Sequence, residues 1–328
     1  MRTNICLALA FAAVPGLWAQ NVISAKSGLI HLAEGDVTLQ GQKVKPKNGE
    51  FPIVAQGETL ATGDARAEVL LNPGVFLRLG ENSSFKMVSN HLTDTRVEIL
   101  TGSAIVEVDE LLKGNSVMLL YHDAKITPLK HGLYRLDAAQ NRFRVFEGEA
   151  QVIQGDQTAQ VKGGHQIEFG AVFLAGKFNR KVGDTLDTWA AARSQRIAQA
   201  NYTSANMVSR GGTSSYTNSN WVWNPYFGLF TYLPATGYGY NPYGWMIYSP
   251  RTVVYYNTYQ PGYGAYSASN GSIDNGSFSR GSVVSSPSQS MGSVSSNPGL
   301  VAAPAPSAAP SVGVGRAGVS SGGGGRGR

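Results

Sequence analysis

The sequence predicts an all-β protein that carries one C-terminal helix and then a low-complexity, disordered tail. Alternating apolar and polar residues run through most segments between residues 28 and 175, and no helical periodicity interrupts them. The composition then changes, because no glutamate follows Glu168, no lysine follows Lys181, and Gly, Ser, Tyr, Asn and Pro dominate the last third. The chain therefore divides into a β region (21–180), a helix (183–201), an aromatic segment (211–265) and a tail (266–328).

Residues 1–19 are predicted to be a secretory signal peptide, with an N-terminal membrane anchor as the alternative. Arg2 gives the positive start, the apolar run 5–18 follows, and the small residue Ala19 precedes a cleavage position. Cys6 is the only cysteine. A cleaved chain would therefore have no thiol for disulfides, nucleophilic catalysis or thiolate metal sites. We expect the protein to be exported, to the periplasm or the cell surface.

Two similar phrases punctuated by glycine mark the β region. RVEILTGSAIVEV (96–108) alternates apolar and polar residues on both sides of Gly102, and RVFEGEAQVI (144–153) does the same around Gly148. IHLAEGDVTLQG (30–41) is a weaker copy. A two-residue period that breaks at glycine indicates two half-buried strands joined at a tight turn or bulge that needs a positive φ. We therefore predict hairpins at both glycines, with their apolar residues inward.

Further strands complete the β region. They are predicted within 65–71, 75–80, 116–129, 132–138 and 157–170. Many short strands at this spacing are typical of a sandwich, a roll or a solenoid of antiparallel hairpins.

The order of these pieces resembles a known family. GETLATGDARAEVLLNPGVFLRLGENSSFKM (57–87), then VEILTGSAIVEV, then RVFEGEAQVI are similar to the FecR domain, and the resemblance covers about 28–170. The turn Asn72–Pro73–Gly74 departs from it, because the family tends to have an acidic residue before the glycine. Signalling members of the family carry an anti-sigma segment and a transmembrane helix before this domain, where this sequence has the predicted signal peptide. The resemblance thus implies a β module outside the cytoplasm of a Gram-negative-like bacterium. The regulation of a sigma factor, which belongs to the family's signalling members, is not implied.

The segment 183–201 is predicted to be the helix of the mature chain. Asp184 can cap its first turn, and Asp187 suits the positive end of the helix dipole. Asn201 is a plausible end. We expect this helix to close the β domain by docking Trp189, with a dimer-forming or partner-binding helix as the alternative.

The aromatic segment is too dense in aromatic side chains to be an ordinary loop. Pro and Gly recur too often for a helix, and exposed apolar patches usually mark interaction sites. It is either a docking surface for a partner or a cover over an edge or face of the β domain. As a docking surface, its anchors would be Trp221, Trp223, Tyr226, Phe227, Tyr243 and Trp245. The tail cannot bury enough apolar surface to fold.

Few residues suggest catalysis. None of the five histidines has metal-ligand spacing, and no nucleophile elbow or phosphate-binding loop occurs. Carboxylates gather at the end of the first phrase, directly after it, and in the second phrase, and we expect them on solvated outer faces of the hairpins. These carboxylates are Glu107, Asp109, Glu110, Glu147 and Glu149.

We therefore expect a non-enzymatic interaction or sensing module with no cofactor, no metal and no integral membrane span. Its partner would be an envelope protein or a glycan. The formal net charge of +6 is modest for 328 residues and contains no charge block, so nucleic acid is not an expected partner. The alternatives are a structural envelope or matrix protein that acts through its tail, and a glycan hydrolase that uses the clustered carboxylates. The sequence does not fix the oligomeric state.

Overall fold

The computed structural model describes residues 26–44, 51–170, 173, 175–212 and 216–253. All of them belong to the first of two units, residues 1–265, into which the chain divides. The predicted signal peptide (1–19), the end of the aromatic segment (254–265) and the predicted tail (266–328) lie outside the described residues.

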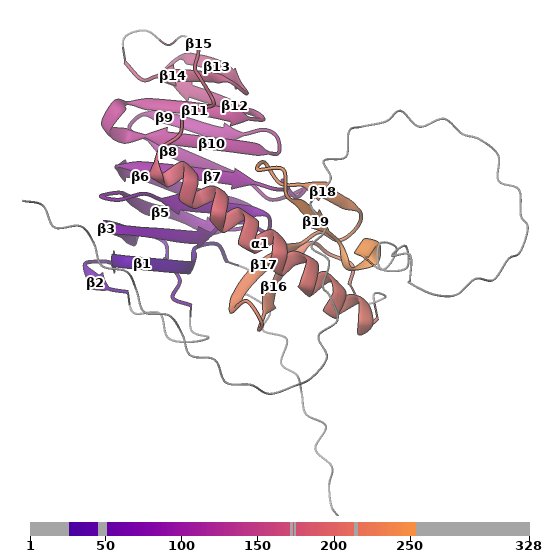
Figure 1. The fold of residues 1–328 in the computed structure, drawn as a ribbon. Helices are drawn as coiled ribbons and strands as arrows, with labels where there is room; N and C mark the ends of the chain where they lie inside the picture. Colours follow the sequence, from indigo (N-terminus) through magenta and orange to yellow (C-terminus); the bar gives the residue numbers. More distant parts are fainter. Residues whose placement is uncertain (1–25, 45–50, 171–172, 174, 213–215, 254–328) are drawn as a thin grey trace, which may run out of the picture. The chain divides into compact units, whose positions relative to one another are not determined.

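The prediction of a β-rich fold with one long helix is confirmed (Figure 1). The first strands are β1 Leu29–Leu39, β2 Gln42–Lys43, β3 Thr59–Leu70, β4 Val75–Leu79, β5 Ser84–His91, β6 Asp94–Thr101 and β7 Ser103–Val108. The next are β8 Val117–Tyr121, β9 Ala124–Pro128, β10 Gly132–Asp137, β11 Arg142–Glu147, β12 Glu149–Gln154, β13 Gln157–Lys162, β14 His165–Glu168 and β15 Gly176–Lys177. A 3₁₀ turn, η1 Ala138–Gln140, joins β10 to β11.

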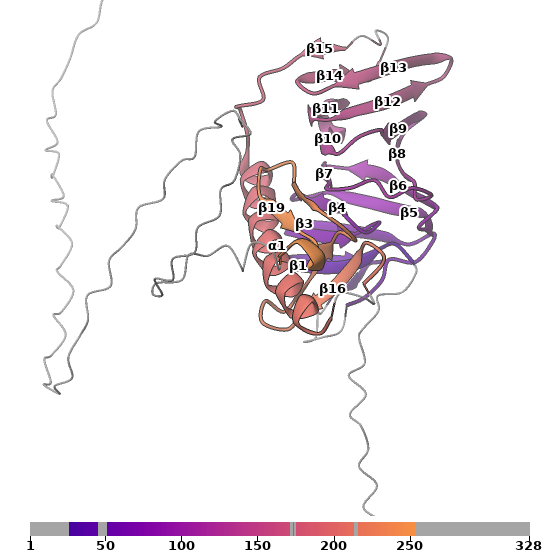
Figure 2. The same ribbon diagram turned by 90° about the vertical axis from the view of Figure 1, so that its right-hand side faces the viewer.

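These strands form one sheet that is folded into two layers (Figure 2). The long strand β3 belongs to both, since its first half pairs with β5 and its second half with β4. We call the layer formed by the second half of β3 with β4, β7, β10, β11, β14 and β15 the covered layer. The layer formed by the first half of β3 with β5, β6, β8, β9, β12 and β13 is the open layer.

The glycines of the repeated phrases mark the corners between the layers, so the prediction of hairpins there was wrong. The strands on either side of Gly102, β6 and β7, do not pair with each other, and neither do β11 and β12 around Gly148. Gly102 has φ +71° and Gly148 has φ +91°. A Cβ at Gly102 would lie 2.6 Å from Ser83 Cα, and one at Gly148 would lie 2.5 Å from the His131 carbonyl oxygen. Only glycine fits these corners, where the chain crosses to the other layer.

The prediction of purely antiparallel strand pairing was wrong at one pair of strands. Among the strand pairs in the described part of the chain, β6–β8 is the parallel one, with Thr95 opposite Val117. The intervening strand β7 lies in the other layer, and the chain returns from it running in the same direction as β6. A hairpin cannot make such a pair, whereas a crossover can.

The main core lies between the layers. The predicted inward residues are buried there, Val97 and Ile99 from the open layer and Val106 and Val145 from the covered layer among them. The two-residue period that predicted the strands therefore also predicted their inner faces.

The helix α1 spans Thr185–Arg210, nine residues beyond the predicted end at Asn201. Asn201 does not end the helix because its side chain is buried and bonded on both sides. Its amide nitrogen donates to the carbonyl oxygens of Tyr232 (2.8 Å) and Tyr248 (3.1 Å), and its amide oxygen accepts from the Tyr248 N–H (2.8 Å). No helix in the described part of the chain is long and apolar enough to cross a membrane.

The described part of the aromatic segment, residues 216–253, folds back onto the β domain and covers one face, which was the second of the segment's two predicted roles. It forms two hairpins, β16 Asn220–Asn224 with β17 Leu229–Leu233, and β18 Tyr238–Tyr240 with β19 Met246–Tyr248. Trp221 and Tyr232 pack with Phe76 of the covered layer and Ile197 of α1 in a second core cluster. Figures 1 and 2 show α1 and both hairpins on the outer side of the covered layer.

Candidate functional site

The start of α1 is fixed to the covered layer by ion pairs. Asp184 caps the helix and forms a reciprocal capping box with Asp187. Arg135 of β10 donates to Asp184 Oδ1 (2.9 Å), to Asp187 Oδ2 (2.7 Å) and to Asp137 Oδ1 (2.8 Å). The hydrogen bond from Arg135 lowers the pKa of Asp184. The predicted cap is confirmed, and its charge also holds the helix on the sheet.

Behind α1 lies a network of buried charged side chains. Glu68 of β3 accepts hydrogen bonds from His31 Nδ1 (2.8 Å), Arg78 Nε (2.7 Å) and Arg193 Nη2 (2.6 Å). Arg78 also binds Glu107 of β7. His31, Glu68, Arg78 and Glu107 are all buried, so the network sits where charge is stable only when it is paired.

The protonation of this network follows from its contacts. Burial alone would raise the pKa of Glu68, but Arg193 and Arg78 bring it well below its usual range. Burial lowers the pKa of His31. His31 Nε2 accepts the backbone N–H of Phe230 (2.8 Å), which requires a neutral ring whose proton is on Nδ1. His31 therefore connects the sheet to β17.

Glu107 lies in the same network, so the predicted solvated position of this carboxylate was wrong. Its Oε1 accepts from Ser194 Oγ of α1 (2.7 Å), and Ser194 Oγ accepts from Asn241 Nδ2 (2.6 Å). Glu149 is also largely buried, where it pairs with Lys130 (2.7 Å). Strand alternation placed Glu107 on the outer face of its layer, but the sequence did not show that α1 covers that face.

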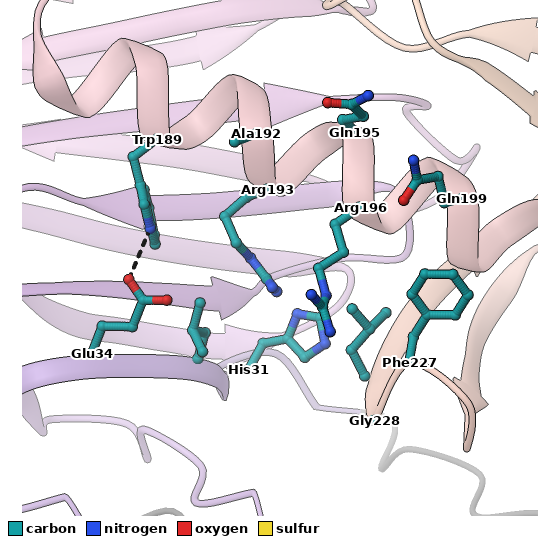
Figure 3. A pocket seen from close by; sticks show the side chains of 12 residues that line it. His31, Glu34, Trp189, Ala192, Arg193, Gln195, Arg196, Gln199, Phe227 and Gly228 are labelled. Carbon is teal, nitrogen blue, oxygen red and sulfur yellow. Dashed lines mark hydrogen bonds between the residues drawn. The ribbon is translucent and has the colours of Figure 1, made fainter. Parts of the chain in front are cut away.

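Beside this network an open groove of about 650 Å³ runs between α1, β1 and the β16–β17 turn (Figure 3). Figure 3 shows the Arg193 and Arg196 side chains extending from α1 toward β1, with Trp189 and Phe227 at opposite ends. The Trp189 indole N–H donates to Glu34 Oε2 (2.9 Å), which closes one end.

The two arginines of the groove differ in what they already bind. Arg193 is committed to Glu68, and its Nε is buried with no hydrogen-bond partner. Arg196 is exposed and has no ion pair among the described residues. Its guanidinium carbon lies 6.0 Å from the centre of the Phe227 ring. The groove thus presents one guanidinium, Arg196, with no ion pair among the described residues, and one exposed carboxylate, Glu34, at the other end.

The predicted aromatic anchors lie in different environments. Trp221 is a core residue at 5% exposure, so it cannot contact a partner in this structure. Trp223 and Tyr243 are half-buried, and Phe227 forms the groove wall. Tyr226 (80% exposed) and Trp245 (40% exposed) are accessible. That any of them binds a partner stays a prediction.

The groove is not evident from the sequence alone, because its lining residues come from distant parts of the chain. The helix covers the sheet as expected, and Trp189 packs against the cluster of Ile105, Leu133, Leu186 and Ala190, although it is only half-buried and also forms the end of the groove. The available signal was the pair Arg193 and Arg196, three residues apart on one helical face. Among the described residues, no group of three or more His, Cys, Asp or Glu side chains is placed to hold a metal ion.

No protein-family model matches the chain, and no curated protein matches it. Two crystal structures of a proposed anti-sigma factor from Parabacteroides distasonis, at 2.50 Å and 1.65 Å resolution, are similar to it. Each is 15% identical with a TM-score of 0.34, and the alignment covers 40% of this chain and 64% of theirs. The chain thus matches less than two thirds of those proteins.

Proposed function

We propose that this protein is a non-enzymatic, exported binding module of the bacterial envelope, and that its partner occupies the groove between α1, β1 and the β16–β17 turn. The groove carries the proposal, since it is an open concave site of about 650 Å³ with convergent charged and aromatic side chains. Export rests on the N-terminal sequence, and the envelope setting on the resemblance in residues 28–170.

The state of the buried carboxylates supports binding over hydrolysis. A glycosidase needs two carboxyl groups that face each other across a substrate cleft. Glu107 instead lies under α1, where Arg78 and Ser194 bind its two oxygens, and Glu68 is held by three partners. These carboxylates hold the cover on the sheet and do not face the groove opening.

A site-specific crosslink tests the proposal. Gln199 is exposed on the groove lining, whereas Lys125 is exposed on the open layer. A photoreactive residue at position 199 of the full chain is expected to capture a partner in the envelope, and one at position 125 is not. Arg196→Gln should abolish the capture at 199, while Arg210→Gln, an exposed arginine at the end of the same helix, should not. Equal capture at both positions, or capture that ignores Arg196→Gln, contradicts the proposal.

A further inference from the structure

The groove contains the chemistry for an anion. Arg193 and Arg196 extend toward the same space from one face of α1 (Figure 3). A carboxylate can accept two parallel N–H bonds from a guanidinium, and such charge-assisted pairs are about twice as strong as neutral hydrogen bonds. The guanidinium of Arg193 already forms an ion pair with Glu68. Arg196 has no ion pair among the described residues, so its guanidinium can bind a ligand anion.

The rest of the lining consists mainly of planar polar and aromatic groups. Gln195 and Gln199 lie along α1. The carboxylate of Glu34 accepts the indole N–H of Trp189 at the end of the groove away from Arg196, so its negative charge does not face the proposed anion position. Phe227 forms a flat apolar wall beside Arg196 at the other end. Such groups suit a ligand that combines hydroxyl groups and C–H faces with a carboxylate.

The open shape and mixed lining of the groove argue against a protein side chain as the main anchor. Binding hot spots for proteins are well-packed pockets that take aromatic or large apolar side chains. The apolar members here, apart from the two aromatic residues, are Leu32, Ala192 and Leu229, and they line an open trough. An acidic peptide would find charge but no such pocket.

We infer that the groove binds an acidic saccharide, with a uronate carboxylate on Arg196 and a sugar ring against Phe227. This inference rests on the proposed function and names the ligand class of the same site. Residues that position the site include Arg193, whose ion pair with Glu68 holds it in place behind the ligand.

A matched pair of ligands tests the inference by calorimetry on the full-length chain. The probe is an oligogalacturonate hexamer, and its control is the same hexamer with every carboxylate methylated as the ester. The acid should bind at least about tenfold more tightly than the ester and should weaken as salt rises. Arg196→Gln should weaken acid binding about tenfold, whereas Arg210→Gln should leave it unchanged. Since Arg196 is exposed, its variant is expected to fold, and circular dichroism checks this.

Other outcomes overturn the inference. They are equal binding of the acid and the ester, no binding of the acid, equal binding of a hexaglutamate peptide, and full competition by inorganic phosphate. If any of these occurs while the Gln199 crosslink still depends on Arg196, the ligand class is wrong and the groove remains the binding site. If the crosslink fails as well, the proposed function fails with it.

Discussion

The outer faces of the two layers are built from the same alternating pattern but end in opposite environments. On the open layer, Lys86 and Lys125 are exposed and Glu98 is half-buried. On the covered layer, Glu68, Arg78 and Glu107 occupy the equivalent outward positions and are buried completely. A charged residue on an outward strand position therefore does not identify a solvated face, because a later segment of the chain can cover it.

The largest expected effect comes from one substitution made on both faces. Glu68→Gln removes the charge that compensates Arg78 and Arg193, and loss of one partner from a buried pair costs about 3–5 kcal/mol. Glu98→Gln changes the same side chain on the open layer and should cost less than about 1 kcal/mol. Urea unfolding of the two variants measures the difference. Similar losses from both would show that the covered face is open to water in solution.

A smaller difference in the free energy of unfolding is expected between variants of two tryptophans in the aromatic segment. Trp221 packs against Phe76, with ring centres 5.0 Å apart, and against Tyr232 at 6.0 Å. Trp221→Ala should therefore lower the free energy of unfolding by about 3 kcal/mol. Trp245→Ala, at an exposed position, should change it by about 0.5 kcal/mol. If the Trp245 variant unfolds as easily as the Trp221 variant, the segment does not cover the layer as the structure shows.

The smallest effect is a dependence on pH that belongs to the covered face. The unfolded chain protonates His31 near pH 6.5, while burial lowers the pKa of His31 in the folded protein. The stability that the neutral ring contributes is complete above pH 6.5 and is lost as the pH falls below it, by up to about 2 kcal/mol at pH 5. The lowered pKa of Glu68 adds its own loss only below about pH 4.5.

His31→Gln isolates this dependence, because an amide can accept the Phe230 N–H and donate to Glu68 without titrating. Unfolding free energies at pH 7.5 and pH 5.0 should differ less in the variant than in the unmodified protein. An identical pH dependence in both would mean that His31 is not held neutral by β17.

Local pattern predicted the strands and their inner faces, since a period of two fixes which side chains face the core. It also predicted the helix start, because Asp184 and Asp187 act within one turn. Pairing was not predictable in the same way. The residues around Gly102 are compatible with a hairpin and with a corner between layers. The structure has a corner because β7 pairs with β4 and β10, which are not its neighbours in the sequence, and not with β6.

The candidate site depended even more on distant contacts. His31 and Phe227 lie almost two hundred residues apart in the sequence and line one groove. The sequence around Asn201 does not show that its side-chain amide will donate hydrogen bonds to β17 and β19. Asparagine often ends a helix, but these bonds hold Asn201 inside α1. Residue types therefore predicted the local backbone conformation. The groove could not be predicted from them, because it forms only where α1 and the β16–β17 turn pack beside β1.

The corners at Gly102 and Gly148 have a consequence for how the chain assembles. Because the chain changes layer at each corner, each layer is built from segments that alternate along the sequence with those of the other layer. The face that α1 covers comes from residues 29–147, all of which precede the helix in the sequence. The helix supplies the cover that buries Glu68, Arg78 and Glu107, so a chain cut before α1 would leave these charges facing water. We expect such charges on an uncovered face to oppose association with other chains, although they are costly to bury once the cover is in place.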